Sequence, residues 1–135
     1  MADITVTAAS VRPVGQCIVR RFTAGGTITP GQAVRISADD TVVVAQGDTI
    51  AHAQVIGLAV SNGEGAVSFS ANNVVDVVLR GTVAGFLANV TANGTAYIGD
   101  VAGIMTVAVG TEPCRVGIGV NATTLLVNPM LLHSA

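Results

Sequence analysis

The sequence contains no lysine and no tryptophan, and only 10% of its 135 residues are charged, compared with about a quarter in an average domain. A disordered chain is excluded, because such chains are rich in charged and polar residues. Nucleic-acid binding is not expected, since the largest basic cluster is the pair Arg20-Arg21 and phosphate binding needs several grouped cations. A surface with so little charge is unfavourable for an isolated monomer, so we expect other molecules to cover much of it.

Long apolar runs are also missing, although half of the residues are hydrophobic. The longest uncharged stretches, 81–99 and 116–135, are interrupted by Gly, Thr, Asn or Pro. Neither stretch predicts a membrane-spanning helix, which needs about 20 mainly apolar residues. The first residues lack the basic and apolar regions of a secretory signal, so we expect synthesis in the cytoplasm and no membrane partner.

Residues from which a catalytic or metal site could be built are scarce. Cys17 and Cys114 lie far apart without a CxxC pattern, so we expect two free, buried thiols. His52 and His133 have no metal-ligating neighbours at a suitable spacing, and His52 is predicted to be a loop residue. No pair of carboxylates stands out for acid–base catalysis, and a chain without lysine cannot contain a Walker phosphate loop. Nothing in the sequence favours an enzyme, and we expect no cofactor and no metal.

Short β-branched runs separated by turn residues dominate the chain. The clearest are 41–45, 54–60 and 74–79, and their Val, Ile and Thr residues favour strands. The best helical candidate, 83–90, is weakened by Gly85, and few other segments are free of glycine, proline or turn clusters. The sequence therefore predicts an all-β domain, a small barrel or tulip-like fold with little or no helix.

The turn residues between these runs allow specific predictions. Thr29-Pro30-Gly31 has the pattern of a type II turn, with Pro and Gly at its two central positions. Residues 38–40 are predicted to close a hairpin between their flanking strands, and 62–65 to form a longer hairpin loop. The two glycines in 24–26 are expected to supply a positive φ.

The chain also contains a weak internal repeat. The predicted hairpin at 31–45 is repeated at 94–108, and the run at 55–60 is repeated at 115–120. A half of about 60 residues would bury too little surface to fold alone. The repeat therefore predicts one compact domain built from two similar hairpin-rich halves.

The order of these motifs resembles that of small tailed-phage head decoration proteins, which are also called capsid cement proteins. The resemblance covers roughly residues 14–130, and the segment 55–86 is similar to the core of lambdoid head-stabilising proteins. The motifs that carry it are Thr29-Pro30-Gly31-Gln32-Ala33-Val34, Val55-Ile56-Gly57-Leu58-Ala59-Val60, Val77-Val78-Leu79-Arg80-Gly81-Thr82-Val83, Asn93-Gly94-Thr95-Ala96-Tyr97 and Val116-Gly117-Ile118-Gly119-Val120.

The resemblance implies a β-rich homotrimer that binds the outside of an expanded phage capsid. There it would join neighbouring subunits of the major capsid protein and resist the pressure of packaged DNA. The expected location is the capsid exterior, after synthesis in the bacterial cytoplasm, and no catalytic activity is implied.

In lambdoid relatives an N-terminal arm becomes ordered on the capsid and can add a strand to the coat protein. The matching segment here is 1–14, which precedes a single barrel domain over 15–135. An ordinary first strand of the barrel is the alternative for this segment. If it is an arm that pairs with coat protein by strand addition, the candidate capsid contacts are Ile4, Thr5, Val6 and Val11.

Two other functions stay open. A carbohydrate- or receptor-binding module is one, although the near absence of aromatic residues argues against sugar-stacking platforms. A small trimeric β-barrel enzyme of the nucleotide-hydrolase type is the other, but the acid–base pair and the phosphate loop it needs are missing. The leading hypothesis is a structural protein of the virion.

Overall fold

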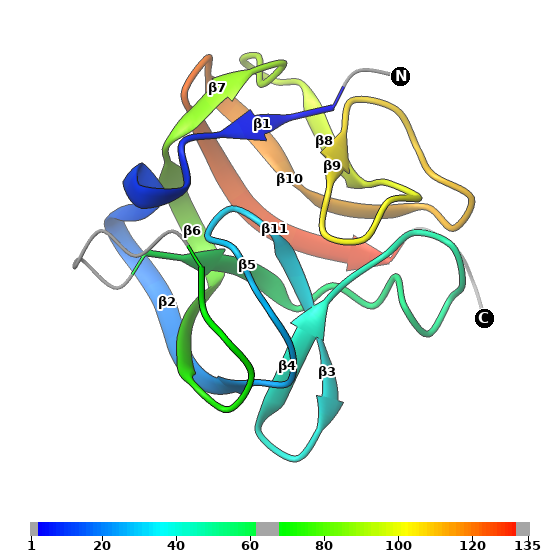
Figure 1. Cartoon of the computed structure of the whole chain (residues 1–135). Helices are drawn as coiled ribbons and strands as arrows, with labels where there is room; N and C mark the ends of the chain where they lie inside the picture. Colours follow the sequence, from blue (N-terminus) through cyan, green and yellow to red (C-terminus); the bar gives the residue numbers. More distant parts are fainter. Residues whose placement is uncertain (1–2, 62–67, 132–135) are drawn as a thin grey trace.

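The computed structural model describes residues 3–61 and 68–131, and it confirms the all-β prediction (Figure 1). No helix in this described part is long and apolar enough to cross a membrane. One short 3-10 turn, η1 (Ala8–Ser10), accompanies the strands. The strands are β1 (Thr5–Val6), β2 (Arg12–Ala24), β3 (Ala33–Ala38), β4 (Thr41–Val44), β5 (Gly57–Val60), β6 (Val74–Ala84), β7 (Phe86–Ala88), β8 (Thr95–Ile98), β9 (Met105–Thr106), β10 (Cys114–Asn121) and β11 (Thr124–Leu131).

Nine strands of the described residues form one sheet in the order β2-β4-β3-β5-β6-β11-β10-β8-β9. The strands are arranged in the same way on both sides of the central β6–β11 pair. On one side, the first strand of the β3–β4 hairpin pairs with β5, which pairs with β6. On the other side, the first strand of the β8–β9 hairpin pairs with β10, which pairs with β11. The repeat predicted from the sequence thus has a structural counterpart in two equivalent halves. Figure 1 shows β3 and β4 in the lower part of the molecule and β8, β9 and β10 in the upper part.

Strands near the N-terminus complete both halves. β2 pairs antiparallel with β6 and parallel with β4, so that β2, β4, β3, β5 and β6 form a closed ring of pairings. In the other half, β1 pairs with β7, which continues β6 after Gly85, and Asp3 forms a bridge with Thr106 in β9. The weak helical candidate at 83–90 therefore contains strand residues and no helix, in agreement with the prediction of little or no helix. Gly85 has a φ of +111°, which interrupts the extended chain between β6 and β7.

Two clusters of buried apolar side chains fill the molecule. The smaller one lies within the five-stranded ring and includes Phe22, Val34 and Val77. The larger one extends through the other half and includes Val83, Phe86 and Leu125. β6 contributes side chains to both clusters, Val75 and Val77 to the smaller and Val78 and Val83 to the larger. A strand that is covered on both faces has apolar residues at consecutive positions, which explains the adjacent Val77 and Val78. Val74 is exposed and Asp76 is half-buried, so this coverage does not extend along the whole of 74–79.

Two of the predicted turns are confirmed. The N–H of Gln32 donates a hydrogen bond to the carbonyl of Thr29 at 3.1 Å, and Gly31 has a φ of +98°. Both features are those of a type II turn with glycine at its second central position. The hairpin between β3 and β4 turns at Asp40, which has a φ of +53°.

The prediction for 24–26 is wrong, because neither Gly25 nor Gly26 has a positive φ. Gly25 is needed for space instead, since a Cβ at this position would lie 2.9 Å from Cγ1 of Val43. The loop predicted at 62–65 lies outside the described residues.

Candidate functional site

The N-terminal segment predicted to contact a capsid is held in the fold, where β1 lies along β7 (Figure 1). The N–H of Ile4 donates to the carbonyl of Met105 at 2.8 Å, and the N–H of Thr7 donates to the carbonyl of Gly85 at 2.9 Å. The side-chain amide of Asn89 donates to the carbonyl of Asp3 at 2.8 Å. These bonds attach the segment on two sides, in the manner of a strand.

The four candidate contact residues have different environments. Ile4 and Val11 are 6% and 0% exposed and belong to the larger core, against which Val6 also packs. Thr5 is exposed and Val6 is half-buried. In this conformation Thr5 and part of Val6 are available to another molecule. Ile4 and Val11 can contact another molecule only if they leave the core.

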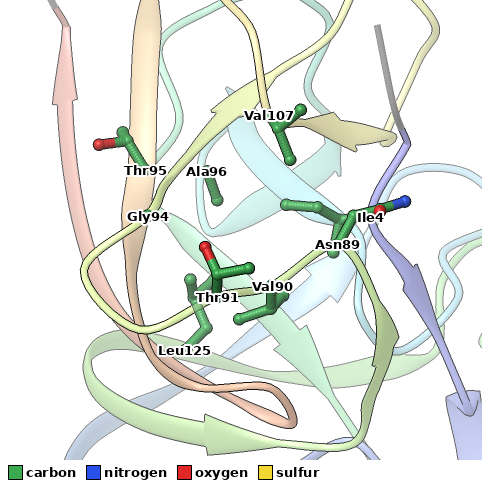
Figure 2. A pocket seen from close by; sticks show the side chains of 9 residues that line it. All are labelled: Ile4, Asn89, Val90, Thr91, Gly94, Thr95, Ala96, Val107 and Leu125. Carbon is green, nitrogen blue, oxygen red and sulfur yellow. The ribbon is translucent and has the colours of Figure 1, made fainter.

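A hollow beside Ile4 is a candidate pocket at this end of the molecule (Figure 2). Its polar side chains are Asn89, Thr91 and Thr95, and none of its lining residues is of a type that titrates near neutral pH. The amide of Asn89 is already engaged with the backbone of Asp3. The hollow can therefore hold a small group or a side chain, but it contains no group for acid–base chemistry.

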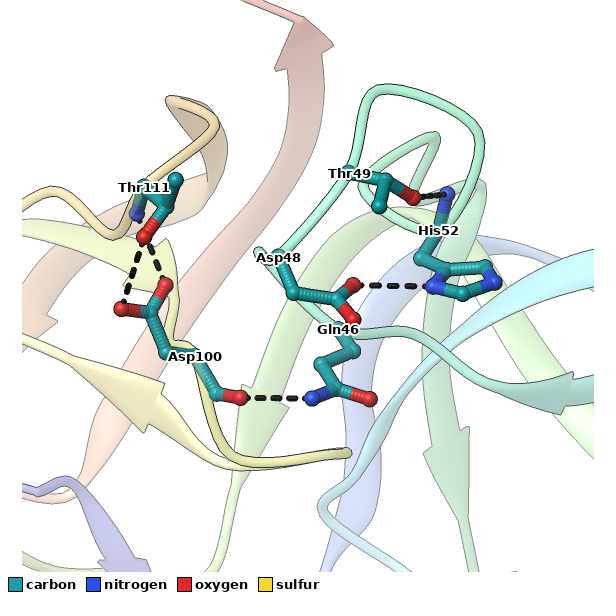
Figure 3. Close-up of polar contacts among 6 residues, drawn as sticks. All are labelled: Gln46, Asp48, Thr49, His52, Asp100 and Thr111. Atoms are coloured by element: carbon teal, nitrogen blue, oxygen red, sulfur yellow. Dashed lines mark hydrogen bonds and ion pairs between the residues drawn. The ribbon is translucent and has the colours of Figure 1, made fainter.

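A network of polar contacts connects the loop after β4 to the loops that flank β9 (Figure 3). The carboxylate of Asp100 accepts hydrogen bonds from the N–H of Thr111 at 2.7 Å and from its hydroxyl at 2.9 Å. The carbonyl of Asp100 accepts a bond from the side-chain amide of Gln46 at 2.7 Å. These contacts join three loops, one of which is distant in the sequence from the other two, and this role is structural.

In the same region Oδ1 of Asp48 lies 2.8 Å from Nδ1 of His52. The hydrogen bond with His52 holds the pKa of Asp48 below its usual value. His52 thus lies in a loop, as predicted, and its Nδ1 has a partner. No group of three or more His, Cys, Asp or Glu side chains in the described part of the chain is arranged to hold a metal ion.

The two cysteines are free, as predicted. Cys114 is buried, and this burial raises the pKa of its thiol, which is the opposite of the change that marks a nucleophilic cysteine. Cys17 is only half-buried, so the prediction of burial holds for it only in part. Its thiol donates to the carbonyl of Thr82 at 3.3 Å, which ties β2 to β6.

The open end of the five-stranded ring is a further candidate site. Along β2, Phe22 lies in the smaller core, and Arg20 and Ile18 follow on the same face at alternate positions. On β3, Ile36 follows the buried Val34 in the same way. The rows of inward-facing side chains on these strands thus extend past the buried core of the ring. There, no other part of the described chain covers them.

These side chains surround an open hollow that we call the ring mouth. Ile18 and Ile36 are 58% and 52% exposed there. An adjoining hollow shares Ile36 and Ile56 with the ring mouth and adds Arg35. The site was not predicted, because the sequence shows the alternation within each strand but not the convergence of strands. The ring mouth is formed chiefly by Ile18, Arg20, Ile36, Ile56, Leu79 and Arg80.

Comparisons with known proteins add no further site. No protein-family model matches the sequence, and no curated protein matches it either. A functional assignment therefore rests on the surfaces described above and on the motifs of the sequence.

Proposed function

We propose that this chain is a structural protein of the tailed-phage virion, a capsid decoration protein that binds the outer surface of the coat lattice and stabilises it. The observation that carries the proposal is the apolar surface. Twelve large hydrophobic side chains of the described residues are between 41% and 66% exposed, in a chain with only fourteen charged residues. Covering such side chains in an assembly removes apolar area from water, which favours association.

The distribution of these side chains supports more than one contact surface. Ile18 lies on β2 and Leu87 on β7, whereas Val101 precedes β9 and Val120 lies on β10. A single partner on one face would leave several of them in water. A protein held between sister subunits and a lattice would cover several faces at once, as subunits of symmetric assemblies do.

The all-β character of the fold agrees with the β-rich structure that the resemblance implies. The motif at 55–60 leads into β5, and the motif at 116–120 lies in β10, so the two occupy corresponding places in the two halves. The competing carbohydrate-binding function lacks a stacking surface. All three phenylalanines are at most 5% exposed, and Tyr97 is half-buried.

The proposal predicts that the purified protein co-sediments with expanded phage heads that lack a decoration protein and consist of the coat protein encoded in the same genome. We expect saturable binding at micromolar protein concentration, and we expect heads that have not expanded to bind much less. Centrifugation followed by gel densitometry measures the bound fraction. Protein that stays in the supernatant with expanded heads at these concentrations would contradict the proposed function.

A homotrimer is the second expectation. Light scattering coupled to size-exclusion chromatography should give a mass of about 40 kDa, three times the chain mass of 13.4 kDa. The physical reason is that a closed ring of three copies covers apolar surface on every subunit. A monomer mass at all accessible concentrations would exclude the trimer.

A further inference from the structure

The arginines at the ring mouth are only partly neutralised. Nη2 of Arg20 pairs with Oδ1 of Asp40 at 2.6 Å, at the tip of the β3–β4 hairpin. Arg80 is exposed and forms none of the ion pairs found among the described residues. Arg35 lies in the adjoining hollow, where its Nε is buried without a hydrogen-bond partner in the described part of the chain. Arg80 therefore has donors left for a ligand beside an apolar surface, and Arg35 adds positive charge in the adjoining hollow.

The positive charges and the apolar side chains of the ring mouth together indicate which ligand fits. Among the described residues, no acidic side chain lines the ring mouth or the adjoining hollow. Carboxylates satisfy guanidinium groups with directed, charge-assisted hydrogen bonds. Ile18 and Ile36 offer apolar contacts next to these groups. A single-stranded nucleic acid fits less well, because Phe22 is 4% exposed and cannot serve as a stacking surface for bases.

The edge of β2 beside the ring mouth provides an independent argument for an extended ligand. From Ile18 to Phe22, β2 pairs with β6 on one side, whereas its pairing with β4 begins only at Thr23. An unpaired edge presents backbone N–H and C=O groups to which another strand can add. Alternate side chains of an added strand would lie on the same face as Ile18 and Arg20, at the ring mouth.

We infer that the ring mouth binds an extended acidic segment of the coat protein, with aliphatic side chains against Ile18 and Ile36 and carboxylates against Arg35 and Arg80. The partner rests on the proposed function, and the inference adds the surface by which the protein is held. The N-terminal segment then keeps its place in the fold while the protein is bound to the capsid.

The main test compares Arg80→Glu with Arg12→Glu in the co-sedimentation assay. Both arginines are exposed and lie on the paired strands β6 and β2, but Arg12 lies outside the ring mouth. Arg80→Glu should weaken binding to expanded heads at least tenfold, about the effect of losing one interfacial charge pair, whereas Arg12→Glu should change it less than about twofold. Ile36→Asp should behave like Arg80→Glu, whereas Ala122→Asp, at an exposed position outside the ring mouth, should bind like the unchanged protein.

Folding of each variant is checked by circular dichroism and thermal unfolding, and only folded variants are compared. The inference is overturned if Arg80→Glu and Ile36→Asp bind heads as tightly as the unchanged protein. A fluorescently labelled eight-residue peptide of alternating aspartate and valine provides a second, independent readout. Its anisotropy should rise with the unchanged protein, fall at high salt, and stay low with Arg80→Glu or with a lysine–valine peptide.

The two proposals fail in different ways. If the unchanged protein does not bind expanded heads, the proposed function is contradicted and the peptide alone decides the inference. Peptide binding that depends on Arg80 then supports an acidic partner at the ring mouth, and an absence of binding overturns it. Tighter binding of a single-stranded oligonucleotide than of the acidic peptide would also overturn it.

Discussion

Replacing Gly57 by alanine is expected to lower the free energy of unfolding by about 3 kcal/mol, the upper range for overpacking a dense core. A Cβ at this position would overlap the carbonyl oxygen of Val78 on β6 and lie 2.9 Å from Cγ1 of Val77. The carbonyl cannot move away easily, because it belongs to a central strand with side chains packed on both faces. The melting temperature should fall by roughly 10 °C, which differential scanning calorimetry measures.

The repeat supplies a second position for the same experiment, and another glycine supplies the control. Gly117 is the counterpart of Gly57, and a Cβ there would overlap the carbonyl oxygen of Leu126 on β11. Gly117→Ala should therefore be destabilising to a similar extent. A Cβ at Gly26 would meet open space, and its φ is not positive, so Gly26→Ala should change stability by less than about 1 kcal/mol. Equal melting temperatures for Gly57→Ala and Gly26→Ala would contradict the close approach of β5 to β6.

Deleting residues 2–10 is expected to destabilise the protein by about 4 kcal/mol, from lost apolar burial and broken backbone hydrogen bonds. The deletion removes Ile4 from the core and the bonds that Ile4 and Thr7 donate to β9 and to Gly85. It also uncovers Met105 and Phe86, which are 2% exposed in the complete fold. Urea unfolding followed by circular dichroism measures the loss.

This deletion decides between the two interpretations of the N-terminal segment. Lost stability identifies it as a strand of the fold, whereas unchanged stability combined with lost binding to heads would identify it as an arm. A pair of neighbouring substitutions separates core packing from chain length. Ile4→Ala should cost about 2–4 kcal/mol, and Thr5→Ala, on an exposed side chain, should cost less than about 0.5 kcal/mol.

The ring mouth shows why the proposed binding surface was harder to predict than the fold. Arg35 and Arg80 lie far apart in the sequence, and neither belongs to a basic cluster. Ile18 and Ile36 look like ordinary strand residues, because their exposure depends on where the core ends. The candidate residues nearer the N-terminus followed from a resemblance, and the structure places Ile4 and Val11 inside the protein.

The sequence by itself determined the features that depend on local chemistry. Its β-branched runs and turn residues specify strands, the Pro30-Gly31 turn follows from the φ values these residues adopt, and the repeat indicates two similar halves. Only the tertiary structure decided the parallel pairing of β2 with β4, the position of β1 and the convergence of arginines at the ring mouth. These features bring together strands that are distant in the chain. They therefore depend on apolar cores to which several strands contribute side chains.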